Sequence, residues 1–182
     1  MKIAERLKKE NIAEYLIYMW QVEDLIRAND CDIDKIRENI ISRFQWSDEE
    51  REKLTEWYAN LATMMCEEGV RGKGHLQINR NVIINLTDLH IALLASSKFP
   101  FYSSAYFKAL PFIVELRSKN GQKDEPELET CFEALYGMLL LRLQKKEISA
   151  ETIKAMEAIS NLLSMLANYY DKDKKGELKL ED

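Results

Sequence analysis

The sequence is poor in the residues that interrupt regular structure. Its 182 residues include only six glycines and three prolines. Because these two residue types mark turns and end helices or strands, their scarcity favours few turns and long elements. No stretch shows the sustained alternation of apolar and polar residues that is typical of strands. The chain therefore reads as helical throughout.

Cysteine and histidine are scarce as well. The three cysteines, Cys31, Cys66 and Cys131, lie far apart. An odd and sparse set of this kind has neither the pattern of a disulfide framework nor the spacing of a zinc site. We expect small buried or half-buried thiols in a reducing compartment. The two histidines and the lack of a Glu-x-x-His motif argue against a di-iron carboxylate bundle, and we expect no metal and no cofactor.

Long apolar runs are also missing. Charged residues interrupt every run well short of the roughly 20 residues that a membrane-spanning helix needs, and the N-terminus lacks the apolar core of a signal peptide. We therefore expect a cytoplasmic protein without a membrane partner. The net charge of −5 and the isoelectric point of about 5.3 argue against general coating of nucleic acid, although a local basic patch stays open.

What is present suits a globular fold. The hydrophobic fraction is 46% and the charged fraction is 31%. At this length roughly 70% of the unfolded surface is buried on folding, so the core needs neither disulfides nor a metal. We assign residues 1–170 to a single helical domain and residues 171–182 to a charged, disordered tail.

Apolar residues recur at helical spacing along the whole domain. We expect the first helix to run from about Ala4 to Ala28, and the last to follow a cap at Ser149. Pro111 should kink or restart the helix around it, and Gly137 suggests a close helix crossing. An antiparallel bundle of about six or seven helices with short loops follows from this pattern. The predicted breaks and caps are residues 29–32, the capping box Ser47–Glu50, Gly69, Phe99–Pro100, Gly121 and the capping signature Asp124–Glu127.

Five polar residues fall on or beside apolar helix faces and form the first candidate site. They are Glu23, Arg27, Asn79, His90 and Arg142. If their helices meet, Glu23 pairs with Arg27 or Arg142, while Asn79 or His90 adds a hydrogen bond. The functional interpretation is a polar ligand-binding pocket between helices, or an acid or base. The structural interpretation is a satisfied polar network that fixes helix register.

A glycine-rich basic loop, residues 69–75, precedes the predicted fourth helix. Its glycines let backbone amides approach a ligand, and a helix N-terminus favours anions. Four basic side chains could add charge, which makes a phosphate or nucleotide site one interpretation. No strand precedes the loop, so it is neither a Walker loop nor a dinucleotide fingerprint. The alternative is a solvated connection with a glycine cap. The candidate anion-binding residues are Arg71, Lys73, His75 and Arg80.

The C-terminal tail partly matches a calcium-binding loop. Residues 171–182 place acidic residues at positions one, three and twelve and glycine at position six. However, Lys175 replaces an oxygen ligand at position five, and no exiting helix follows. A charged, frayed terminus is the simpler interpretation. Elsewhere, no Gly-x-Ser-x-Gly motif and no Cys–His arrangement suggests a nucleophile, so we expect no catalytic residue.

Four long segments resemble a known family. They are NIAEYLIYMWQVEDLIRA, GHLQINRNVI, LPFIVELRSK and ETCFEALYGMLLLRLQKKEIS. Together they are similar to an uncharacterised bacterial family of all-helical proteins, a domain of unknown function, and the likeness covers residues 1–170. It implies a bacterial, cytoplasmic, helical protein. It implies no activity, cofactor or catalytic residue.

The sequence leaves the biochemical function unknown. The lack of catalytic motifs, together with wide apolar faces on the first and last predicted helices, favours a non-enzymatic protein that acts through protein contacts, with itself as a homodimer or with another protein. The alternative is a small-molecule or anion-binding module that uses the loop at residues 69–80 or an interhelical polar pocket. A hydrolase or transferase at that pocket is a third interpretation.

Overall fold

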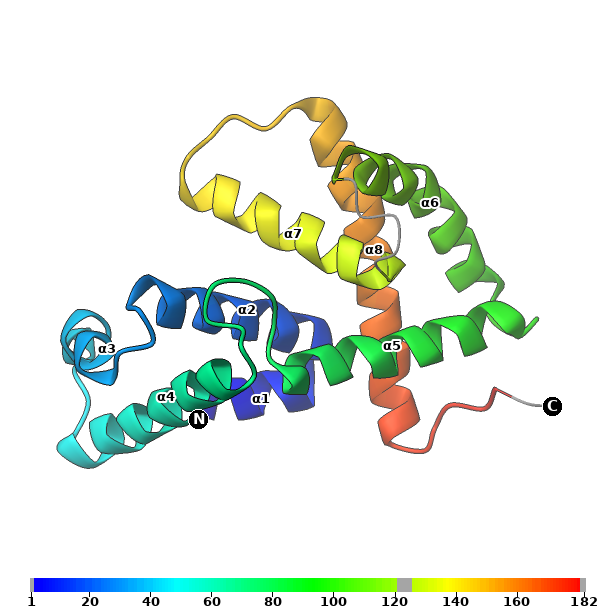
Figure 1. Cartoon of the computed structure of the whole chain (residues 1–182). Coiled ribbons are helices and arrows are strands. Elements are labelled where there is room, and N and C mark those ends of the chain that lie inside the picture. The colour runs from blue at the N-terminus through cyan, green and yellow to red at the C-terminus, as the bar shows by residue number, and fades with distance from the viewer. Residues whose placement is uncertain (1, 121–125, 181–182) are drawn as a thin grey trace. The chain divides into compact units, whose positions relative to one another are not determined.

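The structure, a computed structural model, describes residues 2–120 and 126–180. Within these residues it is all-helical and contains no strand, so the all-α prediction is confirmed (Figure 1). Eight α-helices and one 3₁₀ turn follow each other along the chain. They are α1 (Lys2–Glu10), α2 (Ile12–Ala28), α3 (Ile33–Asn39), η1 (Ile41–Arg43), α4 (Asp48–Glu67), α5 (Gln77–Ala95), α6 (Pro100–Asn120), α7 (Glu127–Leu143) and α8 (Ala150–Lys174).

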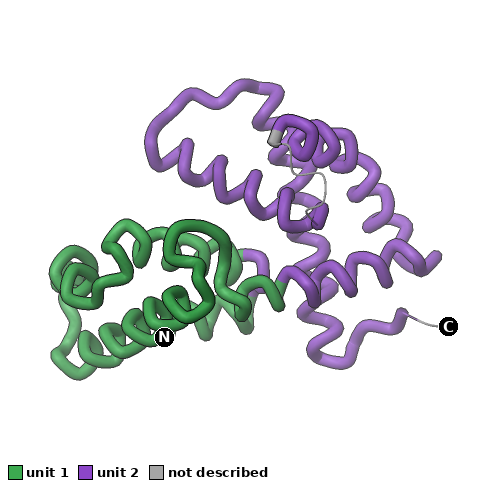
Figure 2. Tube along the Cα trace, viewed as in Figure 1, with its two compact units in different colours: residues 1–10, 14–82 green, residues 11–13, 83–182 purple. Residues whose placement is uncertain are grey.

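Contacts divide the chain into two compact units (Figure 2). The first unit holds residues 1–10 and 14–82, and therefore contains α1, most of α2, α3, α4 and the first turns of α5. The second unit holds residues 11–13 and 83–182, with the rest of α5 and the helices α6, α7 and α8. In the second unit α6, α7 and α8 all pack against one another.

The start of the chain differs from the prediction. A single helix from Ala4 to Ala28 is wrong, because the helix ends at Glu10 and a new one begins at Ile12. The side-chain oxygen of Asn11 accepts the backbone N–H of Ala13 at 3.0 Å, which is how asparagine caps the start of a helix. A local cap thus overrides an apolar pattern that continues through the break.

The other helix ends largely follow the predicted signals. The capping box at Ser47 and Glu50 is confirmed, as is the cap at Ser149. Gly69 follows α4 with a φ of +71°. There the N–H of Val70 donates to the carbonyl of Met65 at 2.9 Å, and the N–H of Gly69 donates to that of Cys66 at 3.2 Å. This is the Schellman arrangement, which requires a left-handed residue after the helix.

Proline and glycine inside helices behave less simply than predicted. α6 continues through Pro111 without a restart. The close crossing at Gly137 is wrong, because a Cβ atom placed there would have no neighbour within 4 Å. Gly121 and the start of the capping signature at Asp124 lie outside the described residues, and α7 begins after Pro126.

Three apolar residues that helical spacing places on the buried stripes of α5, α7 and α8 are exposed instead. Ile78 is 39% exposed, Leu143 is 68% exposed and Ile153 is 39% exposed. All three lie in the first or last turns of α5, α7 or α8. The apolar stripe of a helix continues there beyond the length that its neighbours cover, so spacing alone overestimates burial at helix ends.

The C-terminal helix is longer than the domain boundary drawn from the sequence. α8 continues to Lys174 and so includes Asp171 and Asp173 of the predicted tail. Lys175 pairs with Asp171 at 2.6 Å, and the hydroxyl of Ser96 donates to the carbonyl of Leu180 at 3.2 Å.

Among the described residues no helix is by itself long and apolar enough to cross a membrane, and the bent pair of α5 and α6 together meets the length and composition criteria.

Candidate functional site

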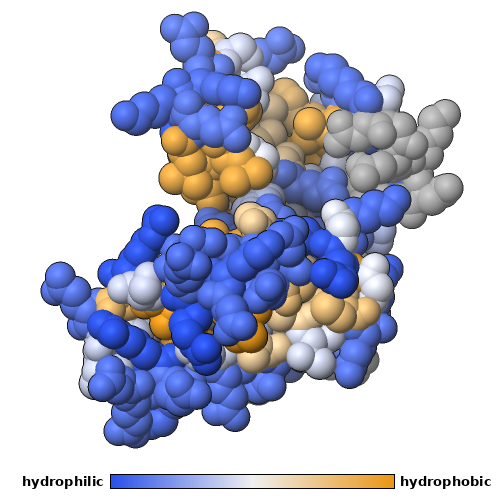
Figure 3. All heavy atoms as spheres, turned by 60° about the vertical axis from the view of Figure 1, so that its left-hand side comes forward, coloured by the Kyte–Doolittle hydropathy of each residue, from blue (hydrophilic) through white to orange (hydrophobic). Residues whose placement is uncertain are grey.

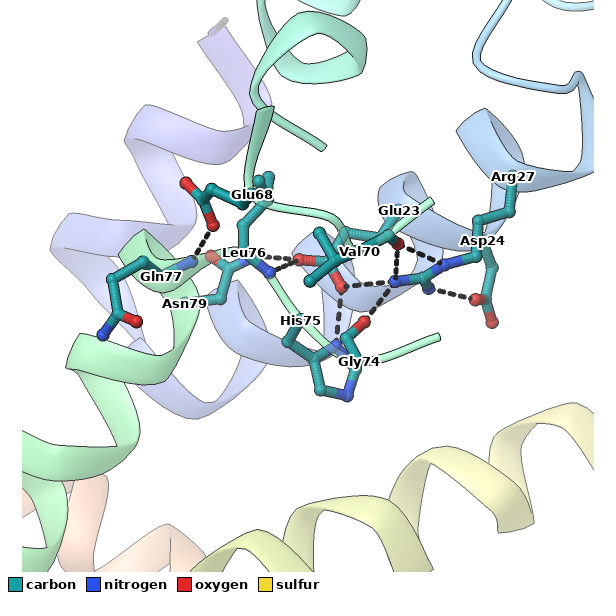
Figure 4. A network of polar contacts seen from close by, with 10 residues as sticks. All are labelled: Glu23, Asp24, Arg27, Glu68, Val70, Gly74, His75, Leu76, Gln77 and Asn79. Carbon is teal, nitrogen blue, oxygen red and sulfur yellow. Dashed lines mark hydrogen bonds and ion pairs between the residues drawn. The ribbon is translucent and has the colours of Figure 1, made fainter. Parts of the chain in front are cut away.

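Glu23 of α2 is the centre of a polar network in the first unit (Figure 4). Its side chain has no exposed surface, and a carboxylate without water must find donors in the protein. Three groups donate to it, and all come from the segment before α5 or from its first turn. They are Nδ1 of His75 at 2.6 Å, the backbone N–H of Leu76 at 3.0 Å and Nδ2 of Asn79 at 2.7 Å.

Arg27 lies one turn further along α2 and holds the preceding loop. Its guanidinium is 3.9 Å from Glu23 and 2.9 Å from Asp24. The same group donates to the carbonyl of Val70 at 3.3 Å and to the carbonyl of Gly74. One side chain therefore joins α2 to both ends of the loop. Two of the contacts predicted for Glu23, those with Arg27 and Asn79, are present.

Carboxylates of the protein itself accept hydrogen bonds from the backbone N–H groups at the start of α5. Oε2 of Glu68 accepts the N–H of Gln77 at 2.7 Å, and Oε1 of Glu23 accepts the N–H of Leu76. The free N–H groups and positive dipole of a helix N-terminus attract anions. Here two carboxylates already take that role, so these amides have internal anionic partners.

His75 points inward from the loop and stacks on Trp20. The two ring centroids lie 4.0 Å apart, with 12° between the ring planes. Nδ1 is the ring nitrogen that faces the Glu23 carboxylate. A carboxylate that orients a histidine in this way is familiar from metal and catalytic sites. Across the described residues, however, no three metal-ligating side chains come together.

The remaining residues of the predicted anion site lie outward. Arg71, Lys73 and Arg80 are exposed. Arg71 donates to the carbonyl of Asp30 at 2.8 Å. Of the four predicted anion-binding residues, only His75 therefore joins the network around Glu23. The other three lie at the surface.

His90 belongs to the second unit and has a different set of partners. Nδ1 of His90 lies 2.6 Å from the hydroxyl of Tyr102. Burial lowers the pKa of His90 and raises the pKa of Tyr102. The neutral His90 ring therefore accepts a hydrogen bond from the Tyr102 hydroxyl, which keeps its proton. Next to them, Tyr106 donates to Glu127 at 2.9 Å and Arg117 lies 3.7 Å from the same carboxylate. The i, i+4 spacing of Tyr102 and Tyr106 is the sequence signal that could have indicated this cluster on one helix face.

Arg142 is exposed, so its predicted place on a buried face is wrong. It lies in the last turns of α7, where the helix borders a groove of about 500 Å³ between α7 and α8. Apolar residues of both helices line this groove, and Glu157 lies on the α8 side. The apolar lining residues are Leu135, Met138, Leu139, Ile153 and Met156.

A second groove, of about 650 Å³, lies between α1 and α4 in the first unit. Trp46 and Trp57 line it together with apolar and charged side chains. Lys2 at its edge pairs with Glu50 at 3.4 Å.

Taken together, the fold and the network define an all-helical protein with a sealed carboxylate centre, and no three metal-ligating side chains converge within the described residues. The chain belongs to the family described as Domain of unknown function (DUF4924), whose model matches residues 1–177. The resemblance to an uncharacterised domain of unknown function over nearly the whole chain is thereby confirmed. No curated protein and no solved structure matches the chain.

The network predicts that Glu23 contributes strongly to stability. We expect Glu23→Gln to lower the free energy of unfolding by about 3 kcal/mol, because the amide cannot accept from three donors and places its own N–H₂ against one of them. Urea denaturation gives the value. Asp24→Asn is the matched control, since it removes a half-exposed carboxylate from the same arginine and should cost less than about 1 kcal/mol. Equal losses in the two variants would contradict the assignment.

The burial of His90 predicts that the folded protein loses stability in mild acid. Burial depresses its folded pKa below the unfolded value of about 6.5. The contribution of neutral His90 to the free energy of unfolding is therefore complete above the unfolded pKa. It is lost as pH falls from there through the folded pKa, because in this range the unfolded chain binds a proton at His90 that the folded chain does not. We expect His90→Asn, which keeps an acceptor for Tyr102, to lose less stability than the wild type between pH 7.5 and pH 5. Parallel urea midpoints in the two proteins would disprove this.

Proposed function

We propose that this protein is a non-enzymatic helical module that acts through protein contacts, as a homodimer joined at the groove between α7 and α8. The Glu23 carboxylate has no exposed surface, and both of its oxygens accept hydrogen bonds from the protein's own donors, which favours the outer surface as the place of function. In the space-filling view, a patch of apolar side chains is visible on the second unit (Figure 3).

The apolar character of the groove carries the proposal. Its walls contain Leu135 and Leu139, which are half-buried, and Met156, which is buried. Among the lining residues Ile153 is 39% exposed, and Leu143, which follows the lining residue Arg142 in α7, is 68% exposed. A surface apolar cluster of this kind, edged by polar residues, is typical of a protein interface. A groove between two helices suits a helical partner.

The charges at the groove favour a second copy as that partner. Arg142 lies on the α7 side and Glu157 on the α8 side. In the described part of the chain neither has an ion-pair partner. A two-fold interface brings each surface against itself, so residue i of one copy meets residue j of the other. Such pairing can set Arg142 of each copy beside Glu157 of the other.

Substitutions in the groove should dissociate the dimer. We expect the wild type to be dimeric by analytical ultracentrifugation and Ile153→Glu to be monomeric, because a carboxylate buried in an apolar interface lacks a partner. Arg142→Glu should weaken the dimer by placing like charges together, and the charge swap Arg142→Glu with Glu157→Arg should restore it.

Val114→Glu is the matched control for the apolar substitution, since Val114 is 56% exposed on α6 and does not line the groove. It should leave the dimer intact. A wild type that stays monomeric across a wide concentration range would refute the proposal. Dissociation by Val114→Glu but not by Ile153→Glu would move the interface away from this groove.

A further inference from the structure

The groove between α1 and α4 lies wholly within the first unit and has the size of a small-molecule site. Its volume is about 650 Å³, and such sites span roughly 300–1,000 Å³. On the α1 side only the first turn lines the groove, with Lys2, Ile3 and Glu5. A docked helix needs anchoring contacts over two or more turns. The groove therefore suits a small molecule better than a helical partner.

Two indoles form the aromatic part of the lining. Trp46 and Trp57 are both half-buried. Trp46 stacks on Phe44, with ring centroids 4.7 Å apart, and Trp57 meets Tyr58 edge-on at 5.1 Å. Rings that are already packed in this way lose little freedom when a ligand binds. The face of an indole carries partial negative charge and attracts cations.

Hydrogen bonds fix the segment before α4 that carries Trp46. The N–H of Ser47 donates to Oε2 of Glu50 at 3.3 Å, and the N–H of Glu50 donates to the hydroxyl of Ser47 at 3.3 Å. On the other side of Trp46, Arg51 donates to the carbonyl of Phe44 at 3.2 Å. The capping box that begins α4 therefore also fixes two lining residues, Trp46 and Glu50.

The charges of the groove favour a cation as the ligand. Three carboxylates and two lysines line it. Lys2 pairs with Glu50 at 3.4 Å, and Lys53 pairs at 2.6 Å with Glu49, which does not line the groove. Both ammonium groups are thus taken up by carboxylates. The lining carboxylate of Glu56 is exposed and forms no ion pair among the described residues, so it attracts a cation and repels an anion.

We propose that this groove binds small organic cations that carry an apolar chain, such as alkylammonium ions. The ammonium group would lie against the indoles of Trp46 and Trp57 and beside the carboxylate of Glu56. The apolar chain would contact Ile3 and Leu54. The net charge of −5 attracts such a ligand from solution. The site concerns the first unit alone and is independent of the proposed dimer.

The test is an NMR titration of the isotope-labelled full chain, followed through the indole N–H signals of its three tryptophans. The probe is hexyltrimethylammonium, and hexane-1-sulfonate presents the same chain with the opposite charge. We expect the cation to shift the signals of Trp46 and Trp57 and to leave that of Trp20, which is buried and does not line the groove. The sulfonate should bind about tenfold more weakly, because the indole faces and Glu56 repel it.

Substitutions separate the two parts of the site. Trp57→Leu should weaken binding of the cation about fivefold, because it keeps an apolar surface and removes the indole face. Glu56→Gln, a change at an exposed position, should weaken it about threefold. Glu52→Gln is the matched control, since Glu52 is exposed on the same helix and does not line the groove.

Three outcomes would overturn the proposal. The cation shifts neither the Trp46 nor the Trp57 signal, the sulfonate binds as tightly as the cation, or Glu52→Gln weakens binding as much as Glu56→Gln.

Discussion

A carboxylate with no exposed surface is the constraint around which the first unit is built. Glu23 is enclosed, and removing such a group from water costs several kcal/mol unless donors replace the lost hydration. The donors come from the loop and first turn that precede and open α5, so the loop must fold back onto α2. The Schellman end of α4 at Gly69 turns the chain toward that position, and Arg27 fixes the loop carbonyls once it arrives. The path of the loop and the position of the start of α5 therefore both depend on the buried charge of Glu23.

The network is better suited to specificity than to chemistry. A buried ionic group contributes little net stability, because the cost of desolvation offsets the attraction to its partners. Removing one of the partners is nevertheless costly, because the other is left buried and unpaired. Glu23 accepts from three donors, Glu68 accepts at the next amide, and both serve the N-terminus of α5. Because these donors are already bound to carboxylates of the protein, the polar centre has little capacity to bind an external anion. The apolar groove of the second unit lies outside this network and is available for a protein partner.

The sequence predicts the helices and the unusual polar positions better than it predicts their partners. Helical spacing identified Glu23 and Asn79 as polar residues on apolar faces, and both are buried. It assigned His75 to an anion site, because spacing cannot show that a glycine-rich loop folds back and turns a ring inward. It extended the first helix through Asn11, where a side-chain cap decides the break. It overestimated burial at Leu143 and Ile153, because a periodic pattern carries no information on where neighbouring helices end.

The central claim is that the Glu23 carboxylate holds the loop and the start of α5 on α2. Native-state hydrogen exchange of the Leu76 amide tests it most directly, since this N–H donates to Glu23 although it precedes the first residue of α5. The account predicts that this amide exchanges as slowly as core amides of α2, through opening of the whole unit. Exchange at the rate of a solvated loop would show that the carboxylate does not hold this segment, and would contradict the account.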